Sequence, residues 1–210
     1  NAGHALFTEI ASPDRASRIA AGLMERQFYS GWGIRTVAQG QPRYNPMSYH
    51  NGSIWPHDNA IIAQGLARYG LKRGLDSLFE DIMRSASYMD HRRMPELYCG
   101  FRRRAGRGPT LYPAACSPQA WAAGTPFHML QSLLGLEFDP AARQIRLVRP
   151  RVPASAGDIV IRNLRLGEAV TDFAVRQHGD AISVQVLRTS GDVQVLLVFD
   201  GDEARREKGR

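Results

Sequence analysis

Glu96 is the residue of this sequence whose type and position most suggest chemistry. It is the only carboxylate in two long, aromatic-rich segments, residues 28–56 and 94–116. Segments this long without regular structure are usually functional. Arginines follow Glu96 closely, and nearby cations keep a carboxylate ionised near neutral pH, as a general base requires. The same composition also fits an ordinary loop salt bridge, which the residues taken alone favour.

Aromatic side chains gather in the same two segments. Flat apolar rings bordered by polar groups suit a pyranose, because its C–H faces stack while its hydroxyl groups need hydrogen bonds. For any single ring, packing against the rest of the domain is at least as well supported as contact with a ligand. Their number at one place nevertheless favours a ligand site. The residues concerned are Tyr29, Trp32, Tyr44, Tyr49, His50, Trp55, Tyr98, Phe101, Tyr112 and Trp121.

The adjacent pair His57 and Asp58 invites a metal-binding interpretation. No third or fourth ligand stands at a useful spacing from them, so we expect no metal and no cofactor. Asp58 is better explained as the cap of a helix that begins near Pro56, where the helix dipole favours a negative charge.

Four helices are expected to position the two segments. Proline or glycine boundaries and apolar residues at helical spacing predict helices over about 12–27, 56–69, 74–89 and 117–134. Pro126 should break or kink the last helix. The connections between these helices are long, short and long. In an antiparallel helical layer, this alternation places both long segments at the same end.

From residue 143 onward the apolar residues alternate with period two between Gly/Asp turns, which predicts a small antiparallel β unit. Pro140 and residues 150–153 mark the joint before it. We therefore expect a helical domain over residues 1–140 and a β subdomain over 141–200. Residues 201–210 are predicted to be a disordered tail.

Composition sets the remaining bounds. A chain of 210 residues with 43% hydrophobic residues can form one or two domains. Its net charge of +7 comes almost entirely from arginine, but no basic stripe interleaved with aromatic residues is present, so a nucleic-acid partner is not expected. No window approaches the roughly 18 apolar residues of a membrane span. Two cysteines form no disulfide framework, which favours a reducing, cytoplasmic location.

Four motifs resemble a known family. They are YHNGSIWPHDN at residues 49–59, NPM at 45–47, PELYCGF at 95–101 and CSPQAW at 116–121. Together they look like the C-terminal part of bacterial amylo-alpha-1,6-glucosidase or glycogen-debranching-type proteins, which are six-hairpin glycosidases. The resemblance implies a mainly α fold: a partial (α/α)6 toroid over residues 1–140, followed by the small antiparallel β-sheet subdomain.

The resemblance also implies inverting hydrolysis of an α-glycosidic bond in glycogen-like substrates or small α-glucosides. One carboxylic acid protonates the leaving oxygen while a carboxylate activates water, the two standing roughly 6.5–9.5 Å apart. Glu96 matches the general base of the family by position. The sequence departs from the related YWRGPxW pattern, because His50 and Asn51 stand where Trp and Arg are common. The candidate substrate-binding residues are Trp32, Tyr49, His50, Trp55, Asp58, Tyr112, Gln119 and Trp121.

The expected partner is a carbohydrate, either an α-glucan or an α-glucoside. In such barrels the general acid comes from the earlier half, so the resemblance places it upstream of residue 1. A missing N-terminal barrel half, or self-association, would then complete the fold. Two other functions stay open. One is a non-catalytic carbohydrate-binding or interaction module that keeps the motifs, and the other is a basic nucleic-acid-associated domain with steep salt dependence.

Overall fold

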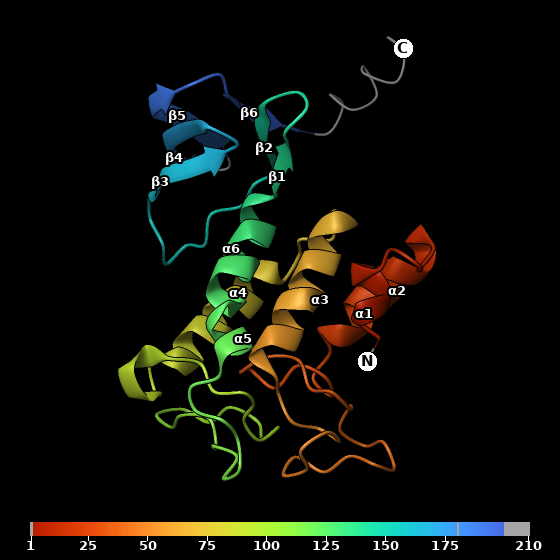
Figure 1. The fold of residues 1–210 in the computed structure, drawn as a ribbon. Coiled ribbons are helices and arrows are strands. Elements are labelled where there is room, and N and C mark those ends of the chain that lie inside the picture. Colours follow the sequence, from red (N-terminus) through yellow and green to blue (C-terminus); the bar gives the residue numbers. More distant parts are fainter. Residues whose placement is uncertain (1, 180, 200–210) are drawn as a thin grey trace. The chain divides into compact units, whose positions relative to one another are not determined.

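The computed structural model describes residues 2–179 and 181–199, and the chain divides into two compact units, Asn1–Leu130 and Gln131–Arg210 (Figure 1). The tail predicted over residues 201–210 lies outside the described residues. The boundaries predicted at 140 and 200 stay predictions.

Helices and long loops make up the first unit. Three of the four predicted helices appear close to their expected bounds, and the fourth is interrupted at Gly124, next to Pro126, as predicted. The short first helix was not predicted. Within the described residues, no helix is both long and apolar enough to cross a bilayer. The helices are α1 (His4–Phe7), α2 (Pro13–Leu23), α3 (Pro56–Arg68), α4 (Leu75–Ala86), the 3-10 turn η1 (Asp90–Arg92), α5 (Ala120–Ala123) and α6 (Thr125–Leu134), which continues into the second unit.

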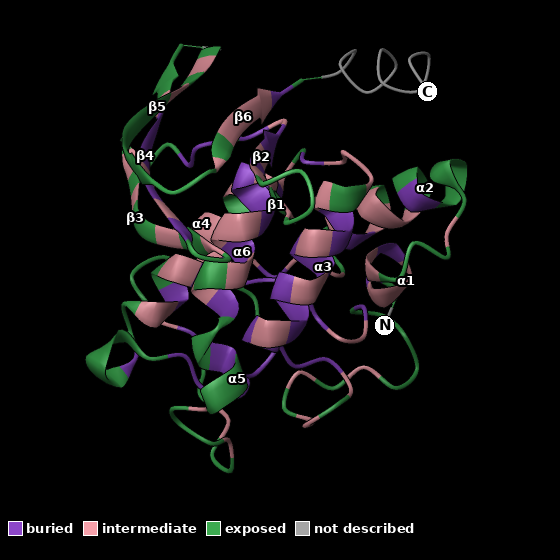
Figure 2. Cartoon of the chain, turned by 45° about the horizontal axis from the view of Figure 1, so that its top comes forward, coloured by how far each residue is buried: buried purple, intermediate pink, exposed green. Residues whose placement is uncertain are grey.

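The sequence explains where α3 and α4 begin and which faces they bury. Pro56 opens α3, since its missing N–H costs nothing at the first helical position. Gly74 precedes α4 with a φ of 84°, and the helix then buries Leu75, Leu78 and Ile82 at helical spacing. Most residues of α3 are buried or intermediate, as Figure 2 shows. The two helices thus form a firm base for the loops that they flank.

Two three-stranded sheets form the second unit, in the orders β1-β2-β6 and β3-β4-β5. The prediction of one antiparallel unit is therefore only partly right. The β3-β4-β5 sheet is antiparallel, but β2 and β6 pair in parallel, and β1 was not predicted. The strands are β1 (Leu136–Asp139), β2 (Gln144–Val148), β3 (Ile159–Leu166), β4 (Ala169–His178), β5 (Ala181–Ser190) and β6 (Gln194–Val198).

The predicted fold class is wrong. Of the described residues, 29% are helical and 24% lie in strands or bridges, so the chain is not a mainly α partial toroid. The helices are short, and the loops between them form isolated β-bridges instead of further helical hairpins. The two sheets add a substantial share of the regular structure.

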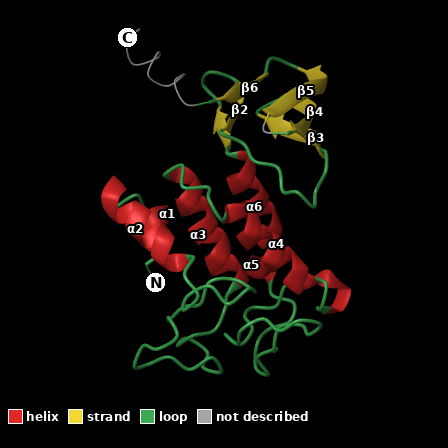
Figure 3. Cartoon of the chain, turned by 180° about the vertical axis from the view of Figure 1, so that it is seen from behind, coloured by secondary structure: helices red, strands yellow, loops and turns green. Residues whose placement is uncertain are grey.

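The two long segments, called here the first loop (residues 28–56) and the second loop (residues 94–116), lie together at one end of α3 and α4 (Figure 3). Antiparallel bridges join Arg35 to Ile54, Ile54 to Tyr98, and Tyr98 to Leu111. The prediction that both loops share one end of the helical layer is therefore confirmed. Glu96 lies within this shared structure.

Candidate active site

The two loops are held in contact through their backbones. Ile54 and Tyr98 exchange two N–H···O=C hydrogen bonds of 2.9 and 3.0 Å. Gly100, two residues after Tyr98, passes so close to Gly52, two residues before Ile54, that a Cβ on Gly100 would stand 1.7 Å from the Gly52 carbonyl oxygen. Only glycine fits at that crossing. The two loops therefore cross in close contact, within four residues of Glu96 along the sequence.

Two buried polar side chains pair the irregular backbone in and around the two loops. The Asn59 side chain accepts the Ile34 N–H at 2.7 Å and donates to the carbonyls of Ile34 and Trp55 at 3.1 and 2.9 Å. The Arg35 guanidinium donates to the Gly100 carbonyl at 2.6 Å and reaches three carbonyls of residues 26–28. Since buried backbone groups must find partners, these side chains replace the ladder that a regular strand would supply.

Glu96 is buried, and both of its carboxylate oxygens accept hydrogen bonds. The Tyr49 hydroxyl of the first loop donates to Oε1, and the Cys116 backbone N–H donates to Oε2 at 3.2 Å. The Glu96 backbone N–H in turn donates to the Cys116 carbonyl at 2.9 Å. The carboxylate is therefore fixed by both loops at once.

These donors keep Glu96 ionised. The Tyr49 hydrogen bond is the largest influence and lowers the pKa of Glu96, while burial opposes it; the Cys116 N–H, the Gln119 side chain and His57 lower it further. The same bond raises the pKa of Tyr49 to about 12, so the phenol stays protonated. The sequence hypothesis credited the arginines near Glu96 with this effect. The main cause is instead neutral donors.

A cavity of about 350 Å³ opens beside Glu96. It lies within the first unit, and we call it the Glu96 cavity. Five of the eight predicted substrate-binding residues line it: Tyr49, His50, Trp55, Asp58 and Trp121. The other lining residues are Thr36, His57 and Glu96. A sixth, Tyr112, packs its ring on Tyr49 with centroids 5.6 Å apart. The structure thus brings residues of both loops and of α3 and α5 to one place.

The aromatic walls of the Glu96 cavity are ordered by ring contacts. The Tyr49 ring packs edge-on against His50 and Trp55, and His50 stacks parallel to Trp55 with centroids 5.8 Å apart. Trp121 stacks on His57 at 4.0 Å and leaves 55% of its surface exposed. One broad indole face is therefore available to a ligand.

His57 was not among the predicted site residues, yet it lines the Glu96 cavity. Its Nδ1 atom is buried and has no hydrogen-bond partner among the described residues. Burial lowers the pKa of His57, so the imidazole is neutral at pH 7. Its position two residues after Trp55 in the same motif was the signal that could have identified it.

Asp58 lies in the first turn of α3, where its carboxylate contacts His4 Nε2 at 2.5 Å. Trp55, not Asp58, is the N-cap residue of α3, so the prediction that Asp58 is the cap is wrong, while its place in the first turn is the one that the helix dipole favours. The reason is geometric: Trp55 occupies the N-cap position, which leaves Asp58 inside the helix. The carboxylate instead faces the Glu96 cavity.

The last two predicted substrate-binding residues, Gln119 and Trp32, lie in different surroundings. The Gln119 side chain acts on Glu96 through a hydrogen bond and leaves its buried Oε1 without a partner among the described residues. Trp32 is only 3% exposed and packs with Ile54, Met89 and Tyr98 in a core cluster. It is absent from the Glu96 cavity, so the structure does not bring it together with the other candidates.

Among the residues that the structure describes, no group of three His, Cys, Asp or Glu side chains could hold a metal ion. The Glu96 cavity presents an ionised carboxylate and an exposed indole, and two buried polar atoms nearby, His57 Nδ1 and Gln119 Oε1, have no partner among the described residues.

A comparison with known families matches residues 4–105 to the Mannosylglycerate hydrolase MGH1-like glycoside hydrolase domain. No curated protein matches the chain. The matched region, just under half of the chain, contains Glu96 and the lining of the Glu96 cavity except Trp121. The match supports a glycosidase family for this chain and, with it, a glycosidase function in general.

Proposed function

We propose that this protein is an inverting glycoside hydrolase that cleaves the α-glycosidic bond of a small glycoside, with Glu96 as general base. The observation that carries the proposal is the hydrogen bonding of Glu96. Both carboxylate oxygens are fixed by donors that lower its pKa, at the edge of an aromatic cavity.

In this mechanism the Glu96 carboxylate takes a proton from a water molecule as the water attacks the anomeric carbon. A carboxylic acid on the other side protonates the leaving oxygen, roughly 6.5–9.5 Å from the base. The Tyr49 hydroxyl and the Cys116 N–H hold the base in one orientation. They also reduce its basicity, which is the cost of keeping it ionised.

The rest of the Glu96 cavity suits a sugar ring. The exposed Trp121 face can stack on the C–H face of a pyranose. Hydroxyl groups can donate to the Asp58 carboxylate, and the neutral His57 imidazole lines the same cavity.

The size of the cavity favours a small substrate. At about 350 Å³, it lies at the lower end of the range of roughly 300–1,000 Å³ that ligand pockets occupy. The matched family carries mannosylglycerate hydrolase in its name, so mannosylglycerate is the first substrate to test. A limit dextrin and a simple α-glucoside represent the glycogen-like alternative.

The decisive experiment is an activity assay on the protein expressed from its complete reading frame. Sugar release from mannosylglycerate, an α-glucoside and limit dextrin is measured, and NMR follows the anomer formed first. We expect release with inversion, and a loss of about 10²–10⁴-fold in kcat for Glu96→Gln.

Trp32→Phe serves as the matched control, because Trp32 is aromatic and lies outside the Glu96 cavity. Release that is indifferent to Glu96→Gln would contradict the proposal. Sugar binding without any release would favour a non-catalytic carbohydrate-binding module.

A further inference from the structure

A second cavity in the first unit has the opposite charge character to the Glu96 cavity. It measures about 240 Å³, and three arginines line it. We call it the arginine cavity. Its lining residues are Trp32, Phe101, Arg102, Arg104, Arg107, Gly108 and Thr110.

Arg103 anchors the segment that carries these arginines. Its backbone N–H donates to the Ser30 carbonyl at 3.0 Å, and its guanidinium lies over the Trp32 ring and pairs with Asp81 at 2.6 Å. The charge of Arg103 is therefore already compensated. Its neighbours on either side, Arg102 and Arg104, are held at the cavity by this anchor.

A tight turn brings Arg104 and Arg107 to the same side. The Arg107 N–H donates to the Arg104 carbonyl at 3.3 Å, and Gly106 has a φ of +70°, which glycine adopts readily. The next glycine, Gly108, lies against Tyr88, whose ring packs edge-on against Trp32 at 5.7 Å. The buried indole of Trp32 thus gives the arginine cavity a firm floor.

Arg102, Arg104 and Arg107 form no ion pair with a carboxylate among residues 2–179 and 181–199. Three like charges around one small cavity repel one another, and an anion between them would remove that repulsion. Guanidinium groups present paired N–H donors that match the oxygens of a phosphate or a carboxylate. The Thr110 hydroxyl adds a further donor.

We propose that the arginine cavity is a binding site for a small oxyanion, a phosphoryl or carboxylate group carried by a small molecule. The cavity volume corresponds to roughly eight water molecules. That size suits one anionic group with a few attached atoms. The site is separate from the Glu96 cavity and does not depend on the glycosidase function.

The test is isothermal titration of the protein with inorganic phosphate and with malonate, at constant ionic strength set with sodium chloride. We expect saturable binding of at least one of them with one site per chain. Binding of phosphate alone identifies a phosphoryl ligand, and binding of malonate alone identifies a carboxylate ligand. The double variant Arg104→Gln/Arg107→Gln should bind at least about tenfold more weakly.

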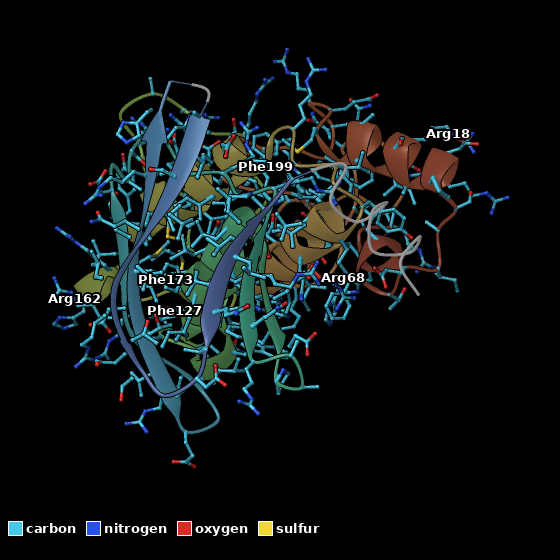
Figure 4. All side chains as sticks on the ribbon, turned by 90° about the horizontal axis from the view of Figure 1, so that it is seen from above. Arg18, Arg68, Phe127, Arg162, Phe173 and Phe199 are labelled. Carbon is cyan, nitrogen blue, oxygen red and sulfur yellow. The ribbon has the colours of Figure 1, made fainter. Side chains whose placement is uncertain are left out.

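The matched control is Arg15→Gln/Arg18→Gln on α2, which removes the same charge from exposed arginines outside the cavity; Arg18 extends away from α2 in Figure 4. This control should retain full affinity, as should Glu96→Gln, whose behaviour separates the anion site from the glycosidase proposal. Circular dichroism checks that each variant is folded, and Arg102→Gln gives an independent second variant.

Equal weakening in both double variants would overturn the proposal, since it would show a general charge effect. Failure of both anions to saturate the protein would overturn it as well.

Discussion

The loops of the first unit and the sheets of the second unit use their polar side chains in different ways. In the loops, buried side chains such as Asn59 and Arg35 pair with the backbone. In the sheets, the ladders pair the backbone, and polar side chains pair with each other, as Arg188 of β5 does with Asp172 of β4. An irregular backbone needs side chains to satisfy it, so polar substitutions should be costly in the loops and nearly free in the sheets.

The largest effect on stability is expected in the second unit for a buried apolar side chain, because there the polar side chains contribute little. Phe173 on β4 is completely buried, and Figure 4 labels it in the second unit. Phe173→Ala should lower the free energy of unfolding by about 3–5 kcal/mol, because it leaves a cavity in the core. Chemical denaturation measures the change. Val160→Ala, at a position 44% exposed on the neighbouring strand, is the control and should cost far less.

The second prediction tests the polar side. Asn59→Ala removes three hydrogen bonds and leaves the buried N–H and carbonyl of Ile34 without their partner, so it should lower the free energy of unfolding by about 2–4 kcal/mol. The exposed amide Gln177, which bonds the Gly179 carbonyl, provides the contrast. If Gln177→Ala and Asn59→Ala cost the same, the comparison between the two regions fails.

The third prediction concerns pH and the Tyr49 hydroxyl. Because the folded-state pKa of Glu96 is lowered, its carboxylate stays ionised until the pH falls below the ordinary value of 4.5, and the proposed mechanism predicts that activity on this limb is lost only there. Tyr49→Phe removes the principal donor, so the acid limb of kcat/KM should move to higher pH. A profile measured from pH 3 to pH 8 tests this, and an unmoved limb would show that Tyr49 does not set the pKa.

The same shift carries a stability effect of defined sign. Glu96 stabilises the folded protein above its unfolded-state pKa, and that stabilisation is lost as the pH falls through the lower folded-state value. Tyr49→Phe should therefore show a weaker gain in stability between pH 3 and pH 6 than the unaltered protein.

The smallest effect is expected at the surface of the second unit. Arg143 and Asp192 form an ion pair with both side chains more than half exposed. Arg143→Ala should change the free energy of unfolding by no more than about 0.5 kcal/mol, because solvent screens such pairs. A cost near that of Asn59→Ala would erase the distinction between the buried polar side chains of the first unit and the exposed pairs of the second.

Local features of the fold were predictable from the sequence. The proline at the start of α3, the glycine before α4 and the interruption beside Pro126 all follow from chemistry within a few residues. The fold class was not predictable in this way. The parallel pairing of β2 with β6 joins strands about fifty residues apart, and no local period encodes such a partner.

In the candidate site, too, features set by nearby residues were predictable, and those set by distant residues were not. Glu96 was identifiable because it is the only carboxylate of its two loops. The cause of its lowered pKa was not, since Tyr49 reaches it from the other loop. Trp32 and Trp55 are both tryptophans of the first loop, yet Trp32 packs in a core cluster while Trp55 lines the Glu96 cavity. Only the path of the chain separates them.

The crossing of Gly100 over Gly52 has a consequence for the order in which the protein assembles. The two glycines lie nearly fifty residues apart in sequence, and no side chain can stand between them. Closing so large a loop has an entropic cost that local contacts cannot offset, so we expect this step to come after α3 and α4 have docked. Under the proposed function, the site around Glu96 would therefore form only after the helices, and a refolding time course should show helix signal recovering before activity.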